Sequence, residues 1–227
     1  MVAISDPLRR CVWAAELPDE DFARVRRSIV ERKYAKGAYV CHRGDRLDFW
    51  TGVVDGLVKM SAIAASGKAM TFAGIGRGSW FGEGSLLKDE ARKYDIVALR
   101  DTRLALMPKA SFNWLAQNSV AFNRFLVRQL NERMGLFIAT VEQDRIHDPV
   151  ARVARNIAWL LNPVLYPDAG KSIAINQEEL GLVAGLSRAS VNKALQDLES
   201  EGLIRVGPGT IEAVDVARLA AYERGQE

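Results

Sequence analysis

The chain has 227 residues, of which 48% are hydrophobic and 26% charged, and its formal net charge is +3. This length suits two domains with separate cores, and no apolar run approaches the roughly 20 residues of a membrane-spanning helix. Because the N-terminus also lacks a signal-peptide core, we expect a cytoplasmic protein with no membrane partner. Cys11 and Cys41 lack CxxC spacing, which argues against a disulfide framework or a metal site.

The first half of the chain combines two helical patterns with many short strands. Residues 7–33 carry both helical patterns, and the second one opens at Pro18. From about residue 34 to 107, β-rich runs are interrupted about every 8 to 12 residues by turn residues such as Asp55-Gly56. Regular short strands of this kind predict an antiparallel barrel or sandwich.

A long helix is expected to follow the strands. A short helix is predicted over 111–116, and the long one runs from Val120 to about Ile146, or roughly 40 Å. Its apolar residues recur every three or four positions, as in a coiled-coil seam. The seam could pack along its own β-domain or against a second copy, and we favour the homodimer. The expected dimer residues are Phe122, Leu126, Leu130, Met134, Phe137 and Val141.

A change of domain is expected immediately after the long helix. Asp148 followed by Pro149 is an N-cap with a first-turn proline, so a new helix begins there and a hinge is expected at His147-Asp148. The loop over residues 163–171 is the long connector, and it leads through a short strand into the segment that carries most of the chemistry.

That segment, residues 176–206, has the pattern of a helix-turn-helix. The first helix, Gln177 to Val183, ends at Ala184-Gly185-Leu186, where glycine can adopt a positive φ. Ser187 is the predicted N-cap of a second helix, Arg188 to Glu201. After it, two short runs joined by Gly207-Pro208-Gly209 predict a β-hairpin wing.

The second helix carries polar and basic residues in its first two turns, the part of a recognition helix that enters the major groove. Arg188 can donate two hydrogen bonds to O6 and N7 of guanine, and Lys193 can reach guanine or a phosphate. Double-stranded DNA is therefore the expected partner. The expected DNA-binding residues are Gln177, Ser187, Arg188, Ala189, Ser190, Asn192, Lys193 and Thr210.

The charge of this part argues in the other direction. From Asp148 onward there are 8 Lys and Arg against 11 Asp and Glu, a net charge of −3. DNA binding must then depend on a local basic face rather than on bulk attraction. The alternative is a signalling module whose winged helix contacts protein instead of DNA.

The order of these parts, together with GSWFGEGSLLKDEARKYDIVAL at residues 78–99, resembles the cyclic-AMP receptor protein and fumarate-nitrate regulator family of bacterial transcription factors. The resemblance extends over nearly the whole chain. It implies an α+β fold with a β-roll that resembles a cyclic-nucleotide-binding domain, a long dimerisation helix and a C-terminal winged helix-turn-helix. The corresponding ranges are 1–117 for the effector-sensing β-roll, 118–147 for the long helix and hinge, and 148–227 for the DNA-binding domain.

The resemblance also implies an effector site in the β-roll, with cyclic AMP or cyclic GMP as candidate ligands. Glu83 could accept a hydrogen bond from a ribose hydroxyl, and Arg92 could bind a phosphate through two hydrogen bonds. Backbone N–H groups near Gly84 and Ser85 could form an anion nest. The expected effector-binding residues are Gly82, Glu83, Gly84, Ser85, Arg92, Lys93 and Phe137.

Three features depart from the family pattern. Lys93 replaces a small hydroxyl residue, the loop between Glu83 and Arg92 is one residue shorter, and Phe137 and Ile138 stand where cyclic-AMP receptors place hydroxyls against adenine. Another small molecule or no effector is therefore also compatible, and Arg92 and Lys93 could simply pair with nearby acids.

The resulting expectation is a homodimeric transcriptional regulator that binds a palindromic operator and responds to a small-molecule effector. RNA polymerase is a further expected partner. Catalysis is the weakest interpretation, because His42 and His147 lie in different regions and no nucleophile–base pattern, Walker loop or metal-ligand cluster is present.

Overall fold

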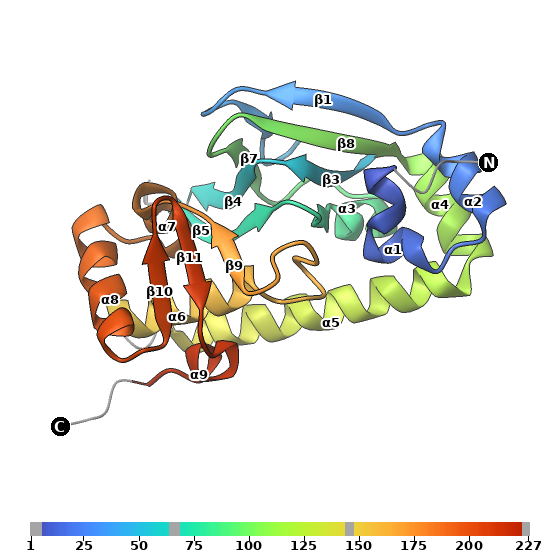
Figure 1. The fold of residues 1–227 in the computed structure, drawn as a ribbon. Helices are drawn as coiled ribbons and strands as arrows, with labels where there is room; N and C mark the ends of the chain where they lie inside the picture. The colour runs from blue at the N-terminus through green and yellow to red at the C-terminus, as the bar shows by residue number, and fades with distance from the viewer. Residues whose placement is uncertain (1–5, 64–68, 144–147, 224–227) are drawn as a thin grey trace.

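The computed structural model describes residues 6–63, 69–143 and 148–223. A β-roll and a smaller winged domain lie side by side, and the long helix α5 (Val120–Gln143) extends along both (Figure 1). Among the described residues, no helix is long and apolar enough to cross a membrane. The predicted hinge residue His147 and the predicted end of the long helix at Ile146 lie outside the described residues.

The β-roll consists of two four-stranded antiparallel sheets, with strand orders β1-β8-β3-β6 and β2-β7-β4-β5. The turn at Asp55-Gly56 joins β3 to β4 as predicted, and Gly56 has a φ of 104° and lies against Thr102, where a Cβ would clash. The strands are β1 (Val30–Tyr34), β2 (Tyr39–Cys41), β3 (Phe49–Asp55), β4 (Leu57–Ile63), β5 (Ala69–Gly76), β6 (Trp80–Phe81), β7 (Asp95–Ala98) and β8 (Thr102–Pro108).

Short helices close one end of the roll over an aromatic core. Trp13 from α1 (Val12–Ala15) lies 5.3 Å from Trp80 and 5.8 Å from Trp50, centroid to centroid, in edge-on geometry. Such pairs stabilise a core beyond the area that they bury. The other helices here are the 3-10 helix η1 (Pro7–Arg10), α2 (Asp19–Arg26), α3 (Glu83–Lys88) and α4 (Lys109–Asn118).

Cys11 and Cys41 are not joined in a disulfide in the described part of the chain. Cys41 is buried in β2, and burial raises the pKa of its thiol to about 11. Burial likewise raises the pKa of the Cys11 thiol to about 11. Both thiols are therefore protonated near neutral pH.

Helix α5 carries two apolar stripes where the sequence indicated one. Phe122 and Leu126, predicted as dimer residues, instead pack in the core of the β-roll domain, which corrects that part of the prediction. A separate exposed stripe contains the other four predicted dimer residues, together with Val127 and Ile138, which were not predicted. Apart from the adjacent pair Phe137 and Ile138, its residues recur at spacings of three and four, as in a heptad repeat. The exposed stripe consists of Val127, Leu130, Met134, Phe137, Ile138 and Val141.

In the described residues, the winged domain contains four helices and a three-stranded sheet around one core. Asp148 caps α6 by accepting a hydrogen bond from Val150 N at 2.9 Å, as predicted. The core also includes Leu57 and Leu99 from the β-roll, so the two domains share buried surface. The elements are α6 (Pro149–Leu160), β9 (Ser172–Ala174), α7 (Gln177–Ala184), α8 (Arg188–Ser200), β10 (Ile204–Gly207), β11 (Thr210–Ala213) and α9 (Val216–Ala220).

Candidate DNA-binding surface and effector cassette

Local capping interactions define the helix-turn-helix. Asn176 and Glu179 form a reciprocal capping box at the start of α7, and Gly185 ends this helix with a φ of 67°. Ser187 caps α8 by accepting a hydrogen bond from Ser190 N at 3.1 Å. These caps satisfy backbone groups that helix ends leave open, which explains why the sequence predicted the boundaries well.

The first turns of α8 form an exposed surface. Arg188, Ala189, Asn192 and Lys193 are exposed, whereas Val191, on the opposite side of the helix, is fully buried. The side chains of Ser187 and Ser190 lie beside each other, with their oxygens 2.8 Å apart. The predicted reader side chains therefore face solvent on one side of α8.

The structure brings three of the predicted DNA contacts together in one hollow. Gln177 at the start of α7, Arg188 at the start of α8 and Thr210 on the wing all line a cavity of about 320 Å³. The side chain of Gln177 also donates a hydrogen bond to Asn192 Oδ1 at 3.0 Å, which links the two helices. The surface thus combines both helices and the wing.

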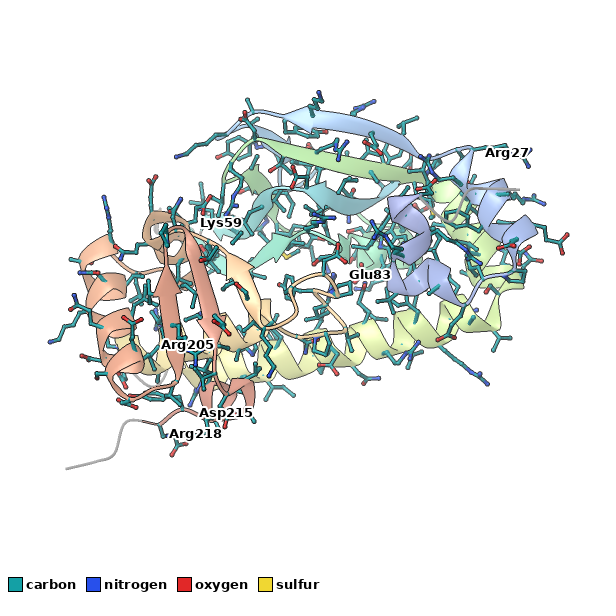
Figure 2. All side chains as sticks on the ribbon, in the orientation of Figure 1. Arg27, Lys59, Glu83, Arg205, Asp215 and Arg218 are labelled. Carbon is teal, nitrogen blue, oxygen red and sulfur yellow. The ribbon has the colours of Figure 1, made fainter. Side chains whose placement is uncertain are left out.

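The predicted effector cassette lies between β6 and α3. Gly82 precedes α3 with a φ of 95°, and Glu83, the first residue of α3, is only 2% exposed. Figure 2 shows Glu83 in the middle of the molecule, between the β-roll and α5. Both oxygens of its carboxylate are bonded: Oε1 to Arg133 of α5 at 2.5 Å and Oε2 to the Trp50 indole N–H at 3.4 Å.

Arg92 is folded into the protein. It is 2% exposed, and its terminal nitrogens donate hydrogen bonds to the carbonyl oxygens of Gly82 at 2.8 Å and Phe49 at 3.0 Å. Its Nε, however, is buried without a hydrogen-bond partner among the described residues. Glu83 and Arg92, the two charged residues expected to bind a cyclic nucleotide, are both present. In this conformation, however, other protein groups already bond to most of their donor and acceptor atoms.

Among the described residues, the remaining predicted effector residues form no side-chain hydrogen bond or ion pair with Glu83 or Arg92. Lys93 is exposed and pairs with Glu90 at 3.2 Å, and hydrogen bonds from Lys88 and Lys93 lower the pKa of the Glu90 carboxyl. Lys93 thus fits the simple pairing alternative, whereas Arg92 does not. Gly84 and Ser85 are half-buried within α3. Phe137 is 62% exposed, on the apolar stripe of α5.

Arg133 also belongs to this site, although it was not predicted from the sequence. Besides binding Glu83, it donates a hydrogen bond to Trp80 O at 2.6 Å. Arg133 stands four residues after Gln129 and seven after Leu126, on the side of α5 that packs against the β-roll, and the sequence pattern did not identify that side as buried. A basic residue on a buried stripe requires a partner, and Glu83 is the buried acid on the facing element.

We expect Arg133→Gln to lower the free energy of unfolding of the β-roll by about 3 kcal/mol, because it leaves the buried Glu83 carboxylate without its main partner. Urea unfolding, followed by the fluorescence of the nearby tryptophans, measures this loss. Adding Glu83→Gln removes the unpaired charge, so the double variant should be more stable than Arg133→Gln alone. Additive losses from the two single variants would contradict this interpretation.

Both domains of the chain match known protein families. Residues 31–119 match the cyclic nucleotide-binding domain family, and residues 151–222 match the Crp-like helix-turn-helix domain. The Cyclic AMP receptor protein of Thermus thermophilus is 32% identical over 192 residues, covering 83% of this chain and 85% of that protein. The chain belongs to the cyclic AMP receptor protein family.

Other relatives and solved structures agree with this assignment. The cAMP-activated global transcriptional regulator Vfr of Pseudomonas aeruginosa is 26% identical to this chain over 182 residues. The aligned region covers 77% of this chain and 85% of Vfr. The structure of the Thermus thermophilus Catabolite Activator Protein is 26% identical in sequence and has a TM-score of 0.51. The match covers 95% of this chain and 99% of that protein. FixK2 of Bradyrhizobium japonicum, at 19% identity, shares the fold with a TM-score of 0.66 over 88% of this chain and 99% of FixK2.

This family member is therefore a DNA-binding transcriptional regulator with the predicted order of β-roll, long helix and winged helix-turn-helix. The alternative of a signalling module that contacts only protein is not favoured. A cyclic nucleotide remains a candidate effector through the matched domain.

Proposed function

We propose that this regulator binds a palindromic operator as a homodimer, with Arg188 as its main base-reading residue. The main support is the exposed face of α8, where Arg188 lines one hollow together with Gln177 of α7 and Thr210 of the wing. Arg188 is the best suited of these side chains to bind guanine through two hydrogen bonds. Asn192, whose oxygen accepts a hydrogen bond from Gln177, retains amide N–H groups that can reach a base or phosphate.

The exposed stripe of α5 supports the dimer. Met134 is 59% exposed and lies in the middle of a heptad-spaced apolar stripe, the geometry in which two helices pack side by side. A two-fold dimer presents two reader helices, and this symmetry matches a palindromic site. RNA polymerase is a proposed partner on the basis of the family alone.

Selection from a random double-stranded DNA library tests the function directly. We expect the purified protein to enrich an inverted repeat whose half-sites are spaced by about one helical turn or a multiple of it. DNase I footprinting should then show protection over both half-sites. Enrichment of a single unrepeated site, or of no sequence at all, would refute operator binding by a homodimer.

For the effector we propose competition at the cassette. A bound cyclic phosphate would draw Arg92 from the carbonyl oxygens of Gly82 and Phe49, and a ribose hydroxyl would compete with Arg133 for Glu83. Since Arg133 belongs to α5, such competition would act directly on the helix that carries the exposed stripe. A ligand shifts an equilibrium only through contacts that differ between two states, and these contacts do.

We expect calorimetric titration of nucleotide-free protein with cyclic AMP or cyclic GMP to give a binding isotherm that Arg92→Gln weakens by about tenfold or more, because charged hydrogen bonds contribute about 1.5–3 kcal/mol. Lys93→Gln is the matched control: the exposed Lys93 pairs with Glu90, so its loss should change affinity little. Wild-type protein that gives no heat at millimolar nucleotide would show that the cassette binds neither ligand. Equal weakening in both variants would point to non-specific charge attraction.

A further inference from the structure

The turn between β7 and β8 holds a residue that crosses to the winged domain. Arg100 donates hydrogen bonds from Nε to Glu179 Oε1 at 2.8 Å and from Nη2 to Glu179 Oε2 at 2.7 Å. Its Nη2 also donates to Ala174 O, at the end of β9, at 2.8 Å. The guanidinium of Arg100, which belongs to the β-roll, therefore bonds to both α7 and β9 of the winged domain.

The pair is buried on the side of the winged domain. The side chain of Glu179 is only 7% exposed, and that of Arg100 is 33% exposed. A buried carboxylate without a cation is costly, whereas bidentate pairing to arginine fixes both distance and orientation. The pair thus differs from the peripheral contacts between the domains, Arg77 with Asp168 and Lys36 with Glu178, which are solvent-exposed and contribute little.

Glu179 connects Arg100 to the start of the helix-turn-helix. Its Oε2 also accepts a hydrogen bond from Asn176 N at 3.0 Å, and its own backbone N–H donates to Asn176 Oδ1 at 2.9 Å. Gln177, between these two residues, bonds to Asn192 of the reader helix. A short chain of polar contacts therefore joins the β-roll turn to the side chains that we assign to DNA.

The surrounding contact is close. Thr71 of β5 donates a hydrogen bond from its hydroxyl to Leu182 O at 2.9 Å. A Cβ built on Gly74 would lie 2.8 Å from Val183 Cγ2, so only glycine lets α7 approach β5 this closely. Tyr166, from the loop before β9, donates a hydrogen bond to Gly74 O. The winged domain therefore packs directly against β5 of the β-roll, and its reader side chains remain exposed.

We propose that Arg100 is a positioning residue for DNA recognition: through Glu179 it fixes the angle of the helix-turn-helix on the β-roll and so sets the spacing of the two reader helices in the dimer. This inference rests on the proposed function. Arg100 does not itself read bases. Its loss should therefore leave half-site contacts intact and relax the requirement for a fixed distance between half-sites.

The experiment measures spacing discrimination with the full-length protein. Starting from the selected operator, duplexes with one or two base pairs added to or removed from the spacer are titrated, together with a single half-site. Each added pair rotates one half-site by roughly 35° and displaces it by about 3.4 Å. In Arg100→Gln we expect the preference for the original spacer to fall by about tenfold, while half-site affinity stays within about twofold of wild type.

Arg103→Gln is the matched control, because Arg103 lies on β8 and pairs with Glu31 inside the β-roll at 3.5 Å. It should retain the wild-type spacing preference. Arg100→Lys keeps a cation beside the buried Glu179 but cannot reproduce the bidentate geometry. It should fold even if Arg100→Gln does not, and it should still relax the spacing preference.

The outcomes separate the two proposals. Wild-type protein that selects no inverted repeat refutes the dimeric operator-binding function. Wild-type protein that selects one, with its spacing preference unchanged in Arg100→Gln or Arg100→Lys, refutes the role of Arg100 alone. An equal loss of affinity for half-site and full operator in both variants would also overturn it, since a general loss of stability gives that result.

Discussion

Arg188→Ala is expected to abolish specific operator binding, with affinity reduced at least about 30-fold. A bidentate contact with guanine contributes about 1–3 kcal/mol of discrimination, and a dimer that reads two half-sites loses it twice. Binding to random DNA should change little, because phosphate attraction dominates there. Gel shifts with the selected operator and with a scrambled duplex, at one fixed salt concentration, measure both effects.

Arg218→Ala is the matched control for this experiment. It removes the same charge from an exposed position in the same domain, on α9. Figure 2 shows Arg218 beside Asp215 at the lower edge of the domain. If both variants lose specific binding equally, the effect is one of total charge, and Arg188 is not the base-reading residue.

Met134→Asp is expected to convert the dimer to monomer and to weaken operator binding strongly. It would place two carboxylates in an apolar interface, where unpaired charges are strongly disfavoured. Since Met134 is exposed in the single chain, the β-roll should remain folded. Sedimentation at micromolar concentration and tryptophan fluorescence separate loss of association from loss of structure.

The adjacent Gly135→Asp supplies the control. It adds the same charge one position along α5, about 100° around the helix from Met134, where a new Cβ meets no atom of the described residues within 4 Å. Gly135→Asp should therefore remain dimeric. A wild-type protein that already sediments as a monomer would refute the dimer proposal. Leu126→Asp, by contrast, should unfold the β-roll because Leu126 belongs to its core.

The helix-turn-helix was predictable because its determinants are local. The caps at Asn176 and Ser187 and the glycine turn at Gly185 act within four residues of their partners, so the sequence alone indicates the helix ends. The Asp148 cap was correctly predicted for the same reason. The predicted DNA contacts themselves remain proposals, although three of them line one hollow.

The long helix was predictable as a helix, but the roles of its two faces were not. Phe122 and Leu126 follow the same helical periodicity as Met134 and Val141, so spacing alone merged a core stripe with an exposed one. What separates them is the aromatic cluster around Trp50, which packs against Phe122 through residues distant in sequence. Long-range packing of this kind leaves no periodic signal in one sequence.

The effector cassette shows the same limit for polar residues. Gly82, Glu83 and Arg92 could be identified from a motif, but their hydrogen-bond partners come from β3 and from Arg133, which is 50 residues away from Glu83. A motif indicates which charged groups gather in one place. It does not indicate whether those groups are open to a ligand, because this depends on side chains that the fold brings in from elsewhere.

The sharing of Leu57 and Leu99 between the β-roll and the core of the winged domain has a consequence for recombination. A chimera joined near residue 148 would combine a foreign winged domain with a β-roll surface shaped for Val183 and Glu179. A hybrid whose winged domain lacks an acid at the position of Glu179 would leave Arg100 without its acceptor. New regulators should therefore arise more readily when reader residues change inside an intact chain than when whole domains are exchanged.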